Sequence, residues 1–321
     1  MKKNAHNFVP KKFTPSTIGL IGGKGAMGKL LAKLLRENGY EVISSGECLG
    51  MTERDLRNLN NKILHCCDVI IFCVPISVMK HGIPFIVGHD APRGLRNKLL
   101  LEICSTKSEP VAALASIRGP VAIGLHPMFG PAVRSVAGKN VYITPVEYIN
   151  PIMSKRARIC LEWVESFWTG HGAQIIHGTA DEHDQRTPEV QLAPLASAFV
   201  FLRALGQKNA DWQFTRQIRT PNSQLITALA GRMLRPEVAD LYATLIVENG
   251  YSPAMMEQIH AAAAEFLDLI RGGDKAKLAA LLRETALQLP SEIQAEAFSE
   301  SQFIGAALAN RPAVEELLKA G

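Results

Sequence analysis

The stretch TIGLIGGKGAMGKLLAKLLRENG, Thr17–Gly39, decides the fold of the N-terminal half of the chain. Its first residues form an apolar run of strand length, and its last part carries apolar residues at helical spacing up to Gly39. Between them lies the motif Gly23-x-Gly25-x-x-Gly28. The order strand, glycine-rich turn, helix opens an α/β domain with a parallel sheet.

The glycine-rich turn predicts a dinucleotide site. In such turns the first glycine allows the tight bend, the second lets the backbone approach a pyrophosphate, and the third lets helix and strand pack closely. The helix that follows presents its N-terminal N–H groups to the phosphates. A merely structural glycine turn is the alternative, and the strand–turn–helix order favours the dinucleotide. The predicted cofactor-binding residues of the turn are Gly22, Gly23, Gly25, Ala26, Met27 and Gly28.

Two further segments are expected beside the cofactor. Ser44 and Ser45 end the second predicted strand, where an NAD site usually carries an acid that binds the ribose, and Glu47 follows slightly late. Hydroxyls tolerate a 2′-phosphate, but no arginine follows closely, so the sequence leaves NAD and NADP both open. Val74 and Pro75 end a third strand, and their loop is expected beneath the nicotinamide half. An ordinary strand-ending turn is the alternative there.

Strand-like runs alternate with helical segments through the first half, which predicts a Rossmann-type parallel sheet with helices on both faces. From Pro188 onward the chain is rich in Ala and Leu at helical spacing, and strand signals disappear. Those helices are too apolar for isolated surface elements and are expected to bury against each other and against a second copy. We therefore predict a flexible tail (1–16), an NAD(P)-binding Rossmann domain (17–181) and an all-helical dimerisation and substrate domain (182–321).

Composition describes an ordinary soluble protein. The 321 residues are 47% hydrophobic and 20% charged, with a net charge of +5 from 35 basic and 30 acidic residues. These charges are interspersed, which argues against a nucleic-acid stripe, and the mild basic excess suits a small anionic substrate. The 6 cysteines form no CxxC pair and lie mostly in apolar runs, so we expect reduced thiols, no metal site and a cytoplasmic location. We see no signal peptide and no membrane span.

Catalytic candidates follow two later strands. Ser105 and Lys107 come just past a strand end, where ligands bind in open α/β sheets; a solvated loop is the alternative. His126 ends the apolar run of AIGLHPMFGP, and Pro127 and Pro131 restrict the backbone around it. Because its ordinary pKa is near neutral, a histidine at the crevice can take a proton from a hydroxyl as hydride leaves the same carbon. A structural histidine is the alternative.

The motifs GGKGAMG, STK, GLHPMFGP and ADEHD occur in the order found in prephenate dehydrogenases, the TyrA family of tyrosine biosynthesis. The resemblance covers nearly the whole chain from Thr17 and looks closest to the dehydrogenase half of the bifunctional chorismate mutase–prephenate dehydrogenases, without the mutase segment. It implies NAD(P) binding, a helical dimerisation domain, and oxidation of a ring hydroxyl with loss of a carboxylate as CO2. His126 would accept the hydroxyl proton, and Ser105 would hydrogen-bond His126 or that hydroxyl.

The chain departs from the family pattern at its substrate-binding positions. The family carries a second histidine twelve residues after the one in EHD; here His183 leads to Leu195, and Gln191 supports this register. Where the family binds the substrate's ring carboxylate with an arginine, this chain has Gln224. A buried carboxylate without a partner costs several kcal/mol, so another cation is expected to compensate. The candidates are Arg134, Arg216 and Arg219, each of which has a solvated surface charge as its alternative.

Three functions remain open at this point. The chain is a prephenate or arogenate dehydrogenase with a rearranged carboxylate site, or a TyrA-like dehydrogenase for a specialised metabolite such as an amino-substituted prephenate analogue. The third alternative is a non-catalytic dinucleotide-binding dimer. The presence of His126, Ser105 and the glycine turn argues against the third.

Overall fold

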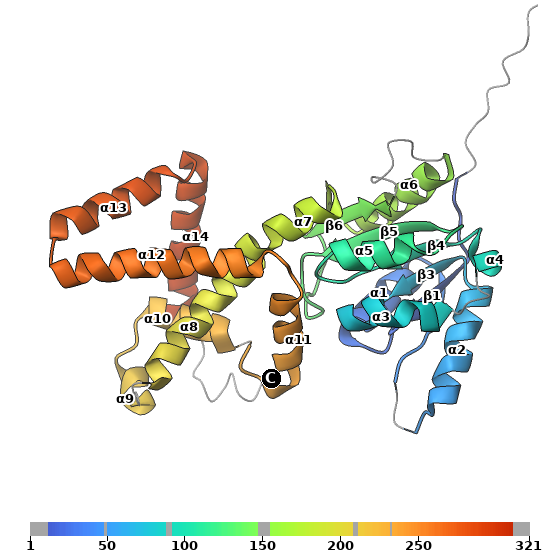
Figure 1. The fold of residues 1–321 in the computed structure, drawn as a ribbon, viewed down its shortest axis with the longest axis horizontal. Helices are drawn as coiled ribbons and strands as arrows, with labels where there is room; N and C mark the ends of the chain where they lie inside the picture. Colours follow the sequence, from blue (N-terminus) through green and yellow to red (C-terminus); the bar gives the residue numbers. More distant parts are fainter. Residues whose placement is uncertain are drawn as a thin grey trace, which may run out of the picture. The chain divides into compact units, whose positions relative to one another are not determined.

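The computed structural model describes residues 12–47, 50–87, 92–146, 155–207, 211–231 and 233–310. The chain divides into two compact units, Met1–Thr187 and Pro188–Gly321 (Figure 1). Of the predicted tail, residues 1–11 lie outside the described ranges.

The first unit is built on one sheet. Among the described residues this sheet has 7 strands in the order β2-β1-β3-β4-β5-β6-β7. The strands are β1 (Thr17–Ile21), β2 (Glu41–Ser44), β3 (Val69–Phe72), β4 (Leu99–Glu102), β5 (Val121–Pro127), β6 (Asn140–Pro145) and β7 (Gln174–His177). Neighbours run parallel except β5 and β6. Because β1 lies between β2 and β3, the chain reverses its direction of travel across the sheet at β1, which is where such sheets bind ligands.

Helices cover both faces of the sheet. On one face α1 (Ala26–Glu37) and α6 (Lys155–Gly170) contribute to one buried apolar cluster. On the other face α2 (Glu53–Cys66), α3 (Ile76–Val87), α4 (Pro92–Leu95) and α5 (Ser108–Ala115) contribute to a second cluster. The first unit ends with α7 (Ala180–Thr187). The Rossmann-type fold expected from the glycine turn is confirmed.

Strand β6 differs from the sequence expectation. The sequence predicts a parallel sheet, and the neighbouring strands are parallel except for β6, which pairs antiparallel with β5, with His126 opposite Tyr142 and Pro127 opposite Val141. The connection from residue 128 to residue 139 contains no helix, and a parallel neighbour would need a crossover of that kind. The return strand also makes His126 part of β5, whereas the sequence placed it just after the strand.

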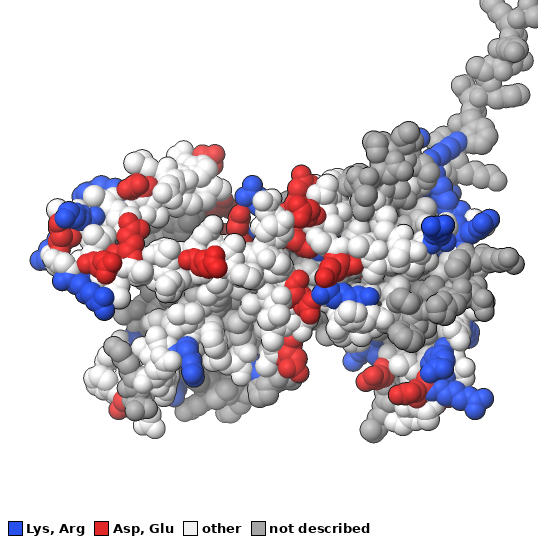
Figure 2. All heavy atoms as spheres, in the orientation of Figure 1, with Lys and Arg blue, Asp and Glu red and all other residues white. Residues whose placement is uncertain are grey.

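The second unit is helical throughout its described residues, as predicted. Its elements are the π-helix η2 (Pro188–Leu192), α8 (Ala193–Gln207), α9 (Trp212–Gln217), α10 (Pro221–Gly231), α11 (Pro236–Val247), α12 (Ser252–Gly272), α13 (Lys275–Leu287) and α14 (Ser291–Ala309). Large apolar side chains stay exposed on these helices, among them Val247 (79%), Leu287 (84%) and Phe303 (75%). On the face drawn in Figure 2, acidic and basic side chains are intermixed.

One helical run, Ala180–Gln207, has the length and the apolar composition to cross a membrane. Length and composition alone are weak grounds for a membrane span, because core helices of soluble proteins share both properties.

Candidate active site

A cavity lies at the carboxyl ends of β1, β2 and β3. We call it the dinucleotide cavity; its volume is about 610 Å³. That volume is within the range of small-molecule sites in proteins. Among the residues that line it are Gly22, Gly25, Ser45, Glu47, Val74 and Pro75, all from the segments that the sequence assigned to the cofactor.

The glycine-rich turn has the close approaches that a dinucleotide needs. Gly22 has φ +82, and a Cβ there would lie 2.3 Å from the Cys73 carbonyl oxygen. The tight bend is therefore at Gly22, one residue before the motif glycine that was expected to make it. A Cβ at Gly28 would lie 2.5 Å from the Gly23 Cα, so helix and turn touch backbone to backbone. Gly25 caps the N-terminus of α1 without a side-chain hydrogen bond. These features fit a bound pyrophosphate.

The expected ribose residues lie at the end of β2. The Ser44 hydroxyl is buried, has no hydrogen-bond partner within the described structure, and is not among the residues that line the dinucleotide cavity. Ser45 is fully buried and donates to Asn60 Oδ1 at 2.5 Å. Glu47 is exposed and lines the dinucleotide cavity. Of these residues, Ser45 and Glu47 line the cavity at the end of β2, where the sequence predicts the ribose. Exposed Ala26 and half-buried Met27 begin α1.

Substitution of Gly28 tests the dinucleotide cavity. Gly28→Ala puts a methyl group within 2.8 Å of the Gly22 carbonyl oxygen and still closer to Gly23, so the turn must shift. We expect the affinity for NAD+ or NADP+ to fall at least about tenfold, as measured by calorimetry. Gly170→Ala is the matched control, because no atom lies within 4 Å of the added Cβ, and it should bind as the parent does. Unchanged affinity of Gly28→Ala would contradict this use of the turn.

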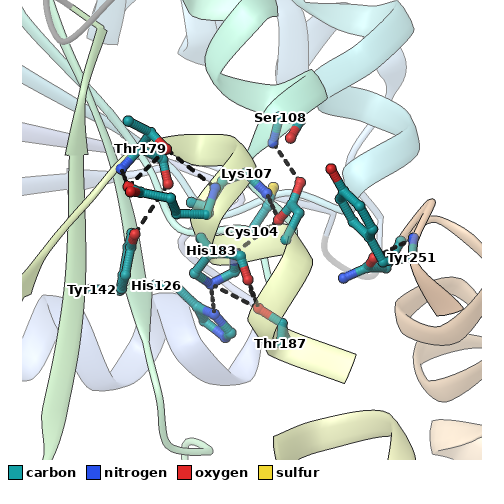
Figure 3. Close-up of polar contacts among 12 residues, drawn as sticks. Cys104, Lys107, Ser108, His126, Tyr142, Thr179, His183, Thr187 and Tyr251 are labelled. Atoms are coloured by element: carbon teal, nitrogen blue, oxygen red, sulfur yellow. Dashed lines mark hydrogen bonds and ion pairs between the residues drawn. The ribbon is translucent and has the colours of Figure 1, made fainter. Parts of the chain in front are cut away.

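His126 lies on β5 with its side chain almost fully buried, at 4% exposure. It shares a sheet edge with the dinucleotide cavity, because β1, β3, β4 and β5 run parallel and end on the same side. Its Nδ1 lies 2.8 Å from Nε2 of His183 on α7. Figure 3 shows the two rings pointing toward one another from the strand and the helix. The ring of His183 also packs against Tyr142, with 4.8 Å between ring centroids.

Asp184 anchors this pair to α5. Its carboxylate accepts hydrogen bonds from the backbone N–H groups of Lys107 and Ser108, both at 2.7 Å, and its Oδ1 lies 2.8 Å from His183 Nδ1. The first turn of α5 therefore receives its cap from a residue on α7. This arrangement fixes α7, and with it His183, against the end of β4 and β5.

Lys107 turns inward. Its side chain is fully buried, forms an ion pair with the equally buried Glu102, and donates to the Leu125 carbonyl at 2.7 Å. Glu102 lies opposite Gly124 across the sheet, and a Cβ at Gly124 would be 2.7 Å from Glu102 Oε1. Glycine at this position thus makes room for the carboxylate. Lys107 holds the backbone just before His126 in place, which favours a positioning role over direct contact with substrate.

The other predicted residues of the first unit are more open. Ser105 is half-buried in the loop before α5, and its hydroxyl forms no hydrogen bond with His126 in the described structure. Arg134 is exposed in the connection between β5 and β6. In the second unit, half-buried Gln191 lies on η2 and half-buried Leu195 on α8.

Three residues that the sequence analysis named at the predicted substrate site line one cavity in the second unit. Gln224 on α10 lines a cavity of about 340 Å³ with Arg216 and Arg219. Gln224 Oε1 is buried without a hydrogen-bond partner among the described residues. Trp212 and Phe201 contribute aromatic walls. The cavity combines two cations with apolar surface, which is the chemistry that recognises a carboxylate on a ring.

The histidine pair makes stability depend on pH. Burial lowers the pKa of His126 well below its ordinary value, and His183 and Lys107 lower it further; burial also lowers the pKa of His183. Below pH about 6.5 the two histidines therefore bind protons in the unfolded chain but stay unprotonated in the folded chain, so the free energy of unfolding falls as pH falls. We expect a loss of about 1 kcal/mol per ring between pH 7.5 and 5.5, measured by urea unfolding. An unchanged free energy of unfolding at the two pH values would contradict the burial of neutral rings.

Sequence reasoning passed over Asp184 and Glu102. Asp184 is the last residue of the EHD motif, and its position next to His183 could have indicated that it belongs to the site. Glu102 lies three residues before Ser105, and a carboxylate at the end of an apolar strand that is expected to be buried indicates a paired charge.

No family model matches the chain. A T-protein of Haemophilus influenzae is 27% identical over 258 residues, which cover 80% of this chain and 63% of that protein. A probable arogenate/prephenate dehydrogenase of Methanocaldococcus jannaschii is 27% identical over 306 residues, 91% of this chain and 65% of that protein. The chain thus spans less than two thirds of the length of these two relatives. A 4-amino-4-deoxyprephenate dehydrogenase of Streptomyces pristinaespiralis is 26% identical over 278 residues, 83% of this chain and 88% of that protein.

Solved structures agree on the fold. A prephenate dehydrogenase from A. aeolicus, in complex with hydroxyphenyl propionate and NAD+, matches with a TM-score of 0.65 at 18% identity over 87% of this chain and 98% of that chain. A Synechocystis arogenate dehydrogenase matches with a TM-score of 0.62 at 21% identity over 85% and 98%. Fold and site define a Rossmann-type dinucleotide-binding protein with a helical second unit. Within that class, the chain is similar to proteins named T-protein, arogenate/prephenate dehydrogenase and 4-amino-4-deoxyprephenate dehydrogenase, and its motifs resemble those of the prephenate dehydrogenase (TyrA) family.

Proposed function

We propose that the chain is a TyrA-type oxidoreductase that oxidises a prephenate- or arogenate-like cyclohexadienol with loss of CO2. The observation that carries this proposal is His126, a buried ring on the same sheet edge as the dinucleotide cavity. The similarity to relatives named T-protein and arogenate/prephenate dehydrogenase supports the same chemistry. NAD+ or NADP+, when bound, supplies the hydride acceptor.

In the proposed reaction His126 takes the proton of the ring hydroxyl while the hydrogen on the same carbon leaves as hydride. The carbonyl so formed draws electrons, through the two ring double bonds, from the bond between the opposite ring carbon and its carboxylate; the carboxylate leaves as CO2, and the ring becomes an aromatic phenolate. The proton then returns to the phenolate oxygen. Burial keeps the pKa of His126 low, so the ring is unprotonated near neutral pH and is able to accept a proton.

Formation of reduced nicotinamide tests the proposal. The purified chain is assayed with prephenate and with arogenate, each paired with NAD+ and NADP+, and absorbance reports turnover. Turnover with one or both substrates is expected. Cofactor binding without turnover of either substrate would overturn the proposal and leave the second or third candidate function.

The second candidate is a TyrA-like dehydrogenase for an amino-substituted prephenate analogue. The Streptomyces relative favours it, because the chain covers 88% of a protein named for such a substrate. The relatives named T-protein and arogenate/prephenate dehydrogenase match at similar identity, so prephenate or arogenate stays the leading substrate. The same assay with 4-amino-4-deoxyprephenate separates the two.

The substrate's ring carboxylate needs a cation, and we assign this role to Arg219 with Arg216 beside it. Both line the cavity that contains Gln224, and Arg219 is half-buried. Arg219→Met should raise KM for the substrate about 30-fold or more, with a smaller change in kcat, since a charge-assisted hydrogen bond contributes about 2 kcal/mol. Arg134→Met, which removes an exposed arginine, is the control and should leave KM unchanged. Equal KM values for both variants would contradict the assignment.

The proposal extends to assembly and location. A second copy of the chain is the expected partner of the second unit, because it would bury the exposed apolar side chains of α11, α13 and α14. Light scattering should give the mass of a dimer, and a monomer at micromolar concentration would contradict this. A biosynthetic enzyme of this family is expected in the cytoplasm.

A further inference from the structure

Three buried side chains form a line that ends on the proposed proton acceptor. Asp184 Oδ1 lies 2.8 Å from His183 Nδ1, and His183 Nε2 lies 2.8 Å from His126 Nδ1. The three residues are 5%, 3% and 4% exposed. His126 comes from β5 and the other two from α7, all within the first unit. Water has little access to this line, so its protons must be arranged by the side chains themselves.

The positions of these protons follow from Asp184. Its carboxylate accepts two backbone N–H bonds at the start of α5, and these bonds, together with that from His183, outweigh burial and keep its pKa below the usual value. A carboxylate only accepts hydrogen bonds, so His183 must carry its proton on Nδ1. The Thr187 hydroxyl donates to the His183 carbonyl and is therefore also an acceptor toward Nδ1.

The tautomer of His126 is then determined. With Nδ1 protonated, neutral His183 presents a lone pair at Nε2. The contact of 2.8 Å to His126 is a hydrogen bond only if His126 donates from Nδ1. Neutral His126 consequently has an unprotonated Nε2, the nitrogen that a proton acceptor must offer.

We propose that Asp184 and His183 are positioning residues that hold His126 as its Nδ1–H tautomer and receive the charge of the proton it accepts. This inference rests on the proposed function. As the substrate O–H bond breaks, a bond forms between that proton and His126 Nε2. The His126 Nδ1–H bond then breaks and the proton bonds to His183 Nε2; the hydride acceptor would be the bound dinucleotide named above. The positive charge ends on His183, beside the Asp184 carboxylate.

Charges around the line favour this direction of transfer. Buried Lys107 disfavours a cation on either ring, and the carboxylate that faces it, Glu102, is already paired with it. The Asp184 carboxylate favours the charged form at His183 through its direct hydrogen bond. Tyr142 from β6 packs on His183 and donates its hydroxyl proton to the Thr179 carbonyl, so it offers no negative charge. His183 is therefore the better-stabilised site for the cation.

Two variants separate positioning from charge uptake. In Asp184→Asn the side-chain NH2 can donate to His183 Nδ1, which reverses both tautomers and puts a proton on His126 Nε2. We expect kcat to fall about 10²-fold or more, with KM values within about twofold, because a histidine in the wrong tautomer is a poor base. In His183→Gln the amide oxygen still accepts from His126 Nδ1–H but takes up no proton. Here the His126 tautomer should persist while kcat falls.

Nitrogen NMR of 15N-histidine-labelled protein reads the tautomers directly, and His126→Asn assigns the signals. The parent and His183→Gln should show Nδ1–H at His126, and Asp184→Asn should show Nε2–H. His177→Asn is the matched control, since His177 contacts Glu165 at 3.0 Å outside this site. An Nε2–H tautomer in the parent overturns the inference, and unchanged kcat in His183→Gln overturns the charge uptake. The spectra require no turnover, so they test the tautomers even if the proposed function is wrong. If Asp184→Asn does not fold, the spectra of the parent and of His183→Gln test the inference.

Discussion

Replacement of His126 by Asn should lower kcat about 10³-fold while the affinity for NAD+ or NADP+ stays within about twofold of the parent's. Asparagine is smaller than histidine, and its side-chain NH2 can still donate to His183 Nε2 in place of the ring Nδ1. It offers no basic nitrogen toward a substrate hydroxyl. The variant therefore removes the proton acceptor and leaves the dinucleotide cavity, which lies at β1, β2 and β3, intact.

Steady-state formation of reduced nicotinamide and calorimetric titration of the cofactor measure the two quantities. His177→Asn is the matched control, because it makes the same substitution at a histidine that pairs with Glu165 at the end of β7 and does not line the dinucleotide cavity. Turnover of His126→Asn within tenfold of the parent rate would mean that another group accepts the proton. Equal losses of turnover and cofactor affinity would instead indicate a role in folding.

Local sequence patterns predicted the parts of the site whose chemistry depends on neighbours in the chain. The glycine turn needs only a strand before it and a helix after it, and both are visible as hydrophobic periodicity in Thr17–Gly39. Likewise, the apolar run before His126 predicted a buried strand that ends near the ligand edge. The helical second unit followed from the Ala- and Leu-rich segments in the same way.

The rest of the site depends on contacts between distant residues. Asp184 caps α5 from 76 residues away, and no local pattern around Ser108 indicates that partner. Lys107 was expected to face the crevice, yet it turns inward because Glu102 and Gly124, on neighbouring strands, leave a polar space behind it. The direction of β6 depends on the absence of a crossover helix after His126. Pairing across a sheet is set by tertiary structure, which a single sequence does not display.

Removal of the Lys107 ammonium should destabilise the chain more than any surface substitution. In Lys107→Met the carboxylate of Glu102 stays in the sheet interior without its cation, which costs about 3–5 kcal/mol for a broken buried pair. Burial already raises the pKa of Glu102 while Lys107 opposes that rise, so the variant raises it further. The pKa of Glu102 is then higher in the folded variant than in the unfolded chain. At a pH between these two values the unfolded chain has released the proton of Glu102, whereas the folded chain still holds it.

Stability of Lys107→Met is therefore expected to fall with rising pH, and its deficit relative to the parent should be larger at pH 8 than at pH 5. Urea unfolding at both pH values measures this difference. Lys107→Met combined with Glu102→Leu removes both charges and should recover much of the loss, because an apolar pair of similar volume replaces a buried ion pair at little cost. Recovery in the double variant would assign the loss to the uncompensated charge. A deficit that is equal at both pH values and persists in the double variant would assign it to packing around β4 and β5 instead.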